Sequence, residues 1–285
     1  MSQSGSTTPV EVNIRHHQPV FDFKCSGLDD WNDRCAARSH FWNGISALLP
    51  NMEVFCVKAV SDEIGKIHEP KLREEIRQFC RQESEHAGHH GSFNQLLYQH
   101  YPGLTAIERA ERGWLSLLAR LPSKQFIAIF VFFEHMTSII GHRGLEAPDN
   151  WFHNADAQLF ELWQWHALEE VAHKAVCFDC HRALGGGYIS RLFGAVVSFL
   201  FMLLPSLTSR IIYLAFKSGQ WRRWRYWKAL LGLLFGRTGV VRLCFLDVLT
   251  FFKPGFEPWQ MDSRALLASY AAAPPTLPTA GTSQS

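Results

Sequence analysis

The sequence lacks the features of a secreted or disulfide-bonded protein. Residues 1–10 are rich in Ser and Thr and do not show the basic and then apolar layout of a signal peptide. The seven cysteines are an odd number at irregular spacing, which does not fit a disulfide framework. These absences predict an intracellular protein with reduced thiols. A chain of 285 residues is nevertheless long enough to bury a substantial core.

Strand patterns are also nearly absent. Apolar residues recur at helical spacing along most of the chain, interrupted by prolines and by the glycine run at residues 185–187. Proline is tolerated at the start of a helix, because its missing N–H would have no helical partner there. With proline as punctuation, the pattern predicts helices over residues 35–48, 51–67, 71–100, 105–120, 123–146 and 155–184.

Four glutamates lie on four different predicted helices, each among apolar neighbours. They are Glu53, Glu83, Glu134 and Glu170. The second and the fourth begin Glu-x-x-His motifs, which end at His86 and His173. Residues three apart share one face of a helix, so each motif can direct a carboxylate and an imidazole to one point.

A carboxylate on an apolar helix face points into the core, where an unpaired charge is very costly. Four such carboxylates repel one another unless cations neutralise them, and two divalent ions would bring the site close to neutrality. The order Glu, Glu-x-x-His, Glu, Glu-x-x-His is that of di-iron and di-manganese bundle proteins. One Glu-x-x-His alone more often lies on a solvated helix face, but two in this order predict two metal ions. Iron is the expected metal, with manganese or zinc as alternatives.

We therefore predict an all-α protein with a ferritin-like four-helix bundle over residues 13–187. An apolar, basic helical extension would follow over residues 188–270. Residues 1–12 and 271–285 have low-complexity compositions that predict disorder.

Further candidates share the helix faces of these motifs. His166 precedes Glu170 by four residues and is a candidate for a seventh ligand, with a core role as the alternative. His90 bears the same relation to His86 and is expected to support a ligand rather than to bind the metal. Thr137 and Ser138 follow Glu134 by about one turn and could transfer protons, although simple packing explains them as well.

Other polar residues of the motifs are expected to have ordinary roles. Glu85 and Glu169 are interpreted as partners of Lys or Arg side chains. Cys177 and Cys180 form a lone Cys-x-x-Cys inside a predicted helix, and no second pair completes a zinc site.

With these residues in hand, the chain resembles the bacterial family named predicted metal-dependent hydrolase, whose members belong to the ferritin-like group. The matching stretches are FCRQESEHAGHH, WHALEEVAHKAVCFD and FFKPGFEPW, within roughly residues 15–265. Glu257 departs from the family pattern, which usually has a histidine there. The spacing of His166, Glu170 and His173 is also similar to the fourth-helix ligands of di-iron arylamine N-oxygenases. The first resemblance implies hydrolysis, and the second implies oxygen chemistry.

We expect an oxygen-dependent di-iron oxidase or oxygenase, since mixed histidine and carboxylate sites suit iron that binds dioxygen. Its electrons would come from an external donor, because no flavin or nicotinamide motif is visible. A metal-dependent hydrolase with a metal-bridged water is the alternative, and a non-catalytic iron-binding protein is the second alternative. One ion is expected on Glu53, Glu83 and His86, and the other on Glu134, Glu170 and His173 with His166.

Acidic residues are nearly missing from the C-terminal third. Residues 182–252 contain ten Lys or Arg and one acid, whereas residues 1–181 contain 16 basic and 23 acidic residues, a balance of −7. Eighteen uncharged residues separate Arg191 from Arg210, and KSGQWRRWRYWK follows with five cations and four aromatic residues. Cations and interfacial aromatics are attracted to anionic headgroups.

These segments predict a cytoplasmic protein that docks peripherally on the inner membrane and acts on a small apolar or lipid-like substrate. A pair of core helices with a solvated basic loop is the alternative. A true span is less favoured, because eighteen residues are at the lower limit for crossing a bilayer. The pattern does not favour nucleic-acid binding. A homodimer is compatible with the sequence.

Overall fold

The computed structural model describes residues 5–14, 19–23 and 27–272. Within these residues the chain is helical, without a β-strand and with one isolated bridge between Asn32 and Ala155. The all-α prediction is confirmed. Disorder is predicted for residues 1–12 and 271–285, of which residues 1–4 and 273–285 lie outside the described residues. Residues 5–12 are described, and the backbone N–H of Thr7 donates to Oδ2 of Asp179 at 2.7 Å. Residues 271–272 form the end of a helix.

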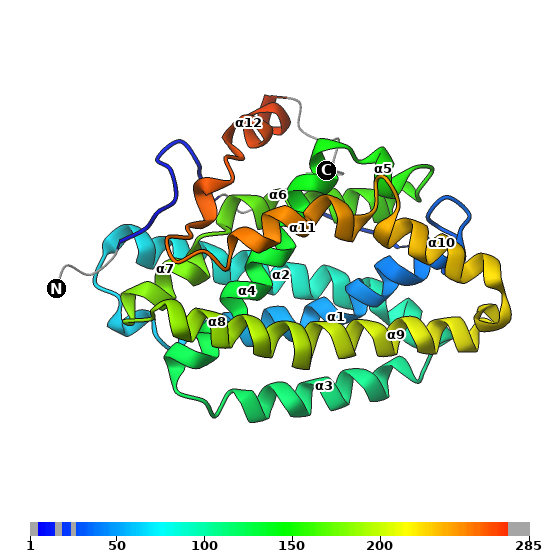
Figure 1. Cartoon of the computed structure of the whole chain (residues 1–285), viewed down its shortest axis with the longest axis horizontal. Coiled ribbons are helices and arrows are strands. Elements are labelled where there is room, and N and C mark those ends of the chain that lie inside the picture. The colour runs from blue at the N-terminus through cyan, green and yellow to red at the C-terminus, as the bar shows by residue number, and fades with distance from the viewer. Residues whose placement is uncertain (1–4, 15–18, 24–26, 273–285) are drawn as a thin grey trace, which may run out of the picture.

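Four helical segments form the central bundle. They are α1 (Ala36–Ser61), α2 (Pro70–His100), α4 (Ser123–Glu146), and α6 (Ala157–His173) continued by α7 (Val176–Ala183). α1 packs chiefly against α2, and α4 packs against α6 and α7. α3 (Leu104–Leu118) connects α2 to α4 along the outside of the bundle (Figure 1). The short α5 (Asp149–Phe152) precedes α6.

Local side-chain bonds fix where the two motif-bearing helices begin. Glu69 precedes α2 and accepts hydrogen bonds from the backbone N–H groups of Lys71 and Leu72, while Pro70 occupies the first helical position. Asp156 precedes α6 and accepts from the N–H groups of Gln158 and Leu159. Such N-caps satisfy donors that have no partner inside the helix. They set the register in which Glu83 and Glu170 face the bundle interior.

The predicted break at Pro50 is wrong, because α1 runs through it without interruption. A proline inside a helix leaves the carbonyl four residues earlier without its N–H donor. Here that carbonyl belongs to Ser46, and the side-chain amide of Asn94 on α2 donates to it at 2.7 Å. A tertiary hydrogen bond thus compensates for the one that Pro50 removes.

The predicted helix over residues 155–184 is two helices rather than one. α6 ends at His173 and α7 begins at Val176, with a turn at Lys174 and Ala175. The buried Lys174 ammonium donates to the carbonyl of Met261 at 2.6 Å and to the hydroxyl of Ser263 at 2.9 Å. The turn therefore carries a side chain that ties the C-terminal segment to the end of α6.

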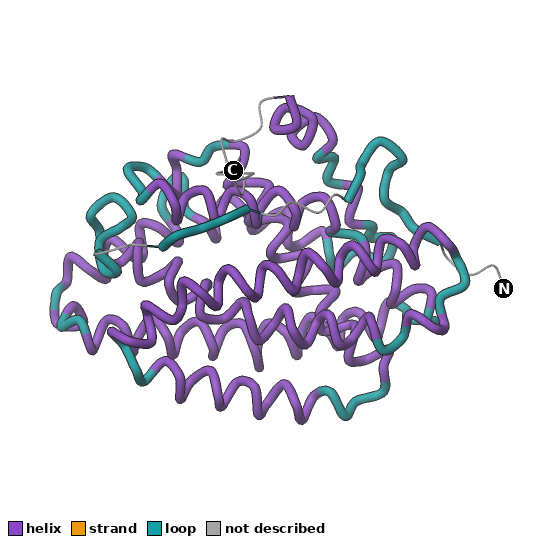
Figure 2. Tube along the Cα trace, turned by 180° about the vertical axis from the view of Figure 1, so that it is seen from behind, coloured by secondary structure: helices purple, strands orange, loops and turns teal. Residues whose placement is uncertain are grey.

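The C-terminal region folds into two helical arms joined by a basic turn. The first arm comprises α8 (Tyr188–Val196), the π-helical η2 (Val197–Leu203) and α9 (Leu204–Lys217). The second comprises α10 (Trp224–Phe235) and α11 (Val240–Thr250), and α12 (Arg264–Ala272) follows. Both arms pack against α1 and α4. Figure 1 shows both arms in front of the bundle, and Figure 2 shows most loops at the ends of the helices.

Candidate metal centre

Seven acidic and imidazole side chains from four helices converge inside the bundle. α1 provides Glu53, α2 provides Glu83 and His86, α4 provides Glu134, and α6 provides His166, Glu170 and His173. All are buried, with at most 4% of any residue exposed. The sequence analysis predicted each of them as a metal ligand, and the structure brings all of them together.

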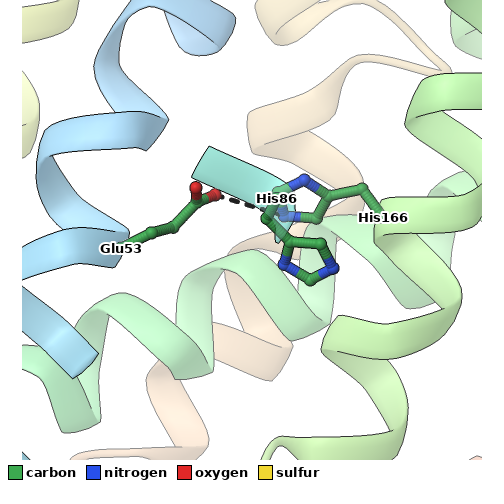
Figure 3. A group of neighbouring side chains, drawn as sticks. All are labelled: Glu53, His86 and His166. Carbon is green, nitrogen blue, oxygen red and sulfur yellow. Dashed lines mark ion pairs between the residues drawn. The ribbon is translucent and has the colours of Figure 1, made fainter. Parts of the chain in front are cut away.

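The potential ligand atoms form two groups, and within each group they lie no more than 4.8 Å apart. The first contains Glu53, His86 and His166, and the second contains Glu83, Glu134, Glu170 and His173. Figure 3 shows Glu53 reaching from α1 toward the two imidazoles of the first group. Its Oε1 lies 3.8 Å from Nε2 of His166. The structure therefore groups His166 with Glu53 and His86, whereas the sequence analysis expected it beside Glu134.

Glu83 and Glu170 lie between the two groups. Oε1 of Glu83 is 3.3 Å from Nδ1 of His86 and 3.1 Å from Nε2 of His173. Glu170 reaches both sides as well, with Oε1 2.9 Å from His166 Nε2 and Oε2 3.6 Å from His173 Nε2. Both carboxylates thus face histidines of the two groups at once, as bridging ligands do.

Several buried atoms directed into the cluster have no hydrogen-bond partner within the described residues. They are both carboxylate oxygens of Glu53 and of Glu83, Oε2 of Glu134, Nδ1 of His86 and Nε2 of His173. Native proteins rarely leave buried polar atoms unsatisfied, because each costs the free energy of its lost hydration. Carboxylate oxygens and imidazole nitrogens that converge in this way are typical ligands of divalent metal ions.

The hydrogen bonds of His86 and His173 leave one nitrogen of each ring facing the cluster. His86 Nε2 lies 3.0 Å from Oε2 of Glu169 and donates to it, so Nδ1 keeps its lone pair. His173 Nδ1 lies 3.0 Å from Oε1 of Gln82 and donates to it, so Nε2 is the nitrogen that faces the cluster. Hydrogen bonds of this kind orient histidines that bind metals.

His166 is held by a longer chain of hydrogen bonds. Its Nδ1 lies 2.9 Å from Nε2 of His90, whose Nδ1 lies 2.9 Å from the hydroxyl of Ser46. That hydroxyl donates to Oδ1 of Asn94 at 2.8 Å. Because the Ser46 hydroxyl donates its proton to Asn94, it accepts a hydrogen bond from Nδ1–H of His90. Nε2 of His90 then carries the lone pair that accepts from Nδ1–H of His166. Nε2 of His166 therefore presents a lone pair to the cluster.

The pKa shifts reflect buried charges of one sign. Burial, followed by the charge of Glu83, raises the pKa of Glu53 well above its usual value. Burial and the neighbouring carboxylates also raise the pKa values of Glu83 and Glu134. Burial would do the same to Glu170, but the adjacent imidazoles of His166 and His173 hold its pKa well below the usual value. Without cations the cluster is electrostatically strained.

The same forces act on the imidazoles. Burial, and then the neighbouring His86, lower the pKa of His166 to about 4, so this ring is neutral near pH 7, the form that binds metals. Burial disfavours the charged form of His173, but Glu134 and Glu170 raise its pKa well above the usual value. A proton on His173 thus partly takes the role that a cation would have.

Two residues of the centre have contacts that were not predicted from the sequence. Glu169 is 2% exposed and contacts His86, a partner in addition to the Lys or Arg that the sequence suggests. The contact of Gln82 with His173 was not predicted. Both lie on faces that the spacing could have indicated, because Glu169 follows His166 by three residues and Gln82 precedes His86 by four.

The remaining candidates differ in their positions. The hydroxyl of Thr137 donates to Oε2 of Glu170, so it touches the cluster. That of Ser138 donates to the carbonyl of His135 at 3.1 Å, and in the structure it bonds away from the cluster. Cys177 lies beside Cys56, with 3.4 Å between the two Sγ atoms, rather than forming a site with Cys180. Cys56 donates to Oε1 of Glu134 at 3.5 Å.

A narrow cavity of about 70 Å³ borders the cluster. One water needs roughly 10–15 Å³, so the cavity can hold more than a single solvent molecule. Its lining is mostly aromatic and aliphatic and includes Trp42, Leu49, Ile140, Trp151, Phe152, Phe160 and Trp163. The polar residues of the lining are Thr137, Gln164, His166 and Glu170. An apolar molecule in this cavity would meet polar groups mainly at the cluster.

Comparison with known families gives one match. The model of the family described as predicted metal-dependent hydrolase matches residues 15–262, which is most of the chain. No curated protein and no solved structure matches. The family resemblance expected from the sequence is confirmed, and with it the dependence on metal. The ferritin-like relationship, the identity of the metal and the number of ions stay predictions.

Proposed function

The chain belongs to the family of predicted metal-dependent hydrolases, and from this premise we propose that it is an enzyme with a two-metal centre. The observation that supports two ions is the set of buried carboxylate and imidazole atoms without hydrogen-bond partners. Two divalent cations would offset the four clustered carboxylates. Their mutual repulsion is visible in the raised pKa values of Glu53, Glu83 and Glu134.

The ligand groups suggest which residues hold each ion. One ion would be bound by Glu53, by Nδ1 of His86 and by Nε2 of His166. The other would be bound by Glu134 and by Nε2 of His173. Glu83 and Glu170, which face both groups, would bridge the ions. Of these residues, His166 and Glu170 line the cavity, so a substrate there would approach the centre from their side.

Hydrolysis is the reaction that the family description favours. Two ions in this position would polarise the bond to be cleaved and lower the pKa of a water between them. Thr137 both lines the cavity and donates to Glu170, so its hydroxyl can position a polar group of the substrate and hold a proton at Oγ1. The apolar walls exclude bulk water and select an apolar substrate with a single hydrolysable group, such as an ester.

Oxygen-dependent oxidation by a di-iron centre is the second candidate, and the composition of the site favours it. Three imidazoles with four carboxylates suit iron in oxygen chemistry, which would require an external electron donor. The cavity also offers few polar groups away from the cluster to orient a hydrolysable bond. An oxidation needs no such bond in its substrate.

One set of measurements separates the candidates. Purified protein is loaded with iron, manganese or zinc, and the metal per chain is determined by elemental analysis. Each form is then assayed with p-nitrophenyl esters of increasing acyl length, and the reduced iron form is assayed for dioxygen consumption. Ester cleavage that is retained with zinc and lost in Glu83→Ala supports hydrolysis. Dioxygen consumption by the iron form alone supports oxidation. Full metal loading without either activity would contradict both enzymatic proposals, and metal storage would then be the remaining function.

A further inference from the structure

The first C-terminal arm carries its large apolar side chains on the outside. They recur at intervals of three, four or eight residues and are Ile189, Phe193, Val196, Leu200, Leu204, Ile212 and Phe216. Each is between 41% and 76% exposed. This spacing places them in one stripe along α8, η2 and α9.

The opposite side of the same arm faces the bundle and buries both apolar and polar residues. Val197, Met202 and Leu214 are buried there, as are Arg191 and Arg210. Nη2 of Arg210 pairs with Oε2 of Glu111 on α3 at 2.7 Å. A helix on the surface of a water-soluble bundle normally has one apolar stripe, directed inward, and a polar outer face. The additional apolar stripe on the outside of this arm indicates that an apolar medium covers the outer face.

The second arm extends this surface. Its exposed apolar residues, 44% to 73% exposed, are Trp224, Leu231, Phe235, Phe245, Leu246 and Leu249. Both arms lie in front of α1 and α2 in Figure 1. Among the residues that the structure describes, three helical segments are long and apolar enough to cross a membrane by length and composition. Ser123–Glu146 is 78% buried in the bundle, but Tyr188–Lys217 and Trp224–Thr250 are only 22% and 28% buried.

The turn between the arms adds positive charge. Arg222, Arg223 and Arg225 are exposed there, beside Trp221 and Trp224. None of these three arginines forms an ion pair with another described residue. Unpaired cations beside exposed tryptophans complement anionic headgroups, because the charge attracts the phosphates and the indole rings lie at the interface.

We propose that the outer face of the two arms, here called the lipid face, docks in the plane of an anionic lipid bilayer. Docking flat fits better than spanning, for two reasons. The inner sides of both arms pack against α1 and α4, so a span would draw the charged bundle into the hydrocarbon. Arg237 and Arg242 are exposed within the second arm, and a charged arginine is costly at the centre of a bilayer.

The lipid face also adjoins the cavity of the metal centre. Trp151, which lines that cavity, donates from its indole N–H to the carbonyl of Thr238 at 2.8 Å. Thr238 lies in the turn between α10 and α11. A bilayer under the lipid face would therefore lie beside a wall of the cavity.

Flotation of the full-length protein with phosphatidylcholine vesicles tests the proposal. We expect binding that increases with the share of phosphatidylglycerol. The triple variant Arg222→Glu, Arg223→Glu, Arg225→Glu should bind such vesicles on the order of 100-fold less, since each cation contributes ~1 kcal/mol near the surface. Lys58→Glu, Arg77→Glu, Arg81→Glu changes the charge equally on exposed positions of α1 and α2 and should bind normally.

A second variant tests the apolar stripe. Leu200→Ser, Leu204→Ser, Ile212→Ser should lose the binding that persists at high salt, and its helical content and metal per chain should equal those of the wild type. Docking does not depend on which reaction the centre catalyses, so failure of either proposal leaves the other intact. Wild type that ignores vesicles of every composition would overturn the proposal. The proposal would also be overturned if the wild type sedimented as a dimer and only this variant were monomeric, because a second copy of the chain would then cover the lipid face.

Discussion

Glu169 on α6 accepts a hydrogen bond from His86 on α2, with 3.0 Å between Oε2 and Nε2, although the residues are 83 positions apart. The converse contact joins Gln82 on α2 to His173 on α6, also at 3.0 Å. In each motif, the residue before the glutamate thus holds the histidine of the other motif. The two Glu-x-x-His motifs are therefore linked crosswise, and each fixes the tautomer of the other.

The first prediction concerns this cross-link. Glu169→Ala should weaken metal binding by about 10–100-fold, because the imidazole of His86 loses the acceptor that orients it. Glu169→Gln keeps an acceptor oxygen and should recover part of the affinity. Competition with a chromogenic chelator measures both. Glu161→Gln, on the same helix but outside the cluster, serves as the control. Equal metal affinity in wild type and Glu169→Ala would refute the orienting role.

The second prediction concerns the ligands themselves. Wild-type protein should contain close to two metal ions per chain. Glu83→Ala and His173→Ala should lower that number sharply, since Glu83 faces both ligand groups and His173 faces three of the carboxylates. Elemental analysis of freshly purified protein gives the stoichiometry. Glu74→Ala, an exposed change on α2, should retain the wild-type content. Full occupancy in both ligand variants would disprove the assignment.

The third prediction concerns the stability of the metal-free protein against pH. Raised pKa values mean that Glu53, Glu83 and Glu134 bind more protons in the folded than in the unfolded state. Stability from such groups is lost as the pH rises, and the raised pKa of His173 acts in the same direction. The lowered pKa values of Glu170 and His166 act oppositely, but the contribution of Glu170 changes only below the usual glutamate pKa of 4.5 and that of His166 only below the usual histidine pKa of 6.5.

The midpoint of thermal unfolding of the metal-free protein should therefore fall as the pH rises from about 6.5 to about 8. With metal bound, the carboxylates stay ionised and paired, so the midpoint should vary less over the same range. Differential scanning calorimetry with and without a chelator measures both midpoints. Titrating groups outside the cluster, such as Asp179, affect the two forms equally and cancel in the difference. A metal-free midpoint that rises or stays constant with pH would contradict the charge balance inferred for the cluster.

The positions of the ligand-bearing helices could be predicted because apolar periodicity is a local signal. Glu53, Glu83, Glu134 and Glu170 interrupt otherwise apolar faces, and that alone directs them inward. Pro50 could not be interpreted in the same way. Whether a helix survives a proline depends on a donor for the freed carbonyl, and here the donor is Asn94, 44 positions after Pro50 and on another helix.

The partners of the ligands were harder to predict than the ligands. Glu169 carries a charge, and the sequence shows no reason why it should pair with His86 rather than with a cation. The grouping of His166 with Glu53 depends on how α1 and α6 approach each other, which no local pattern specifies. The spacing along one helix thus predicts the ligands, whereas their partners and their grouping depend on how the helices pack against one another.

The fourth prediction separates a ligand from its support. His166→Ala should change the electronic spectrum of the cobalt- or iron-loaded protein and lower metal affinity, since Nε2 faces the cluster. His90→Ala should have a smaller effect of the same kind, because His90 only holds Nδ1 of His166. Circular dichroism should show an intact helical fold in both. Equally negligible spectral effects would remove His166 from the ligands.

The last prediction concerns the ion pair that fastens the first C-terminal arm to the bundle. Arg210 and Glu111 have side-chain exposures of 0% and 7%, with 2.7 Å between Nη2 and Oε2. Removing one partner of a buried pair leaves the other charge without compensation, so Glu111→Ala should lower the free energy of unfolding by about 3–5 kcal/mol. Urea denaturation measures this change.

The double variant Glu111→Leu, Arg210→Met should be much less destabilised than Glu111→Ala, because replacing both charges by apolar groups removes the unpaired charge. Glu108→Ala, whose partner Arg112 is 4.0 Å away and largely exposed, should change stability by less than about 0.5 kcal/mol and serves as the control. If Glu111→Ala were as mild as Glu108→Ala, water would reach Arg210. The inner side of the arm would then be solvated at Arg210, and the close packing of this part of the arm against the bundle would no longer hold.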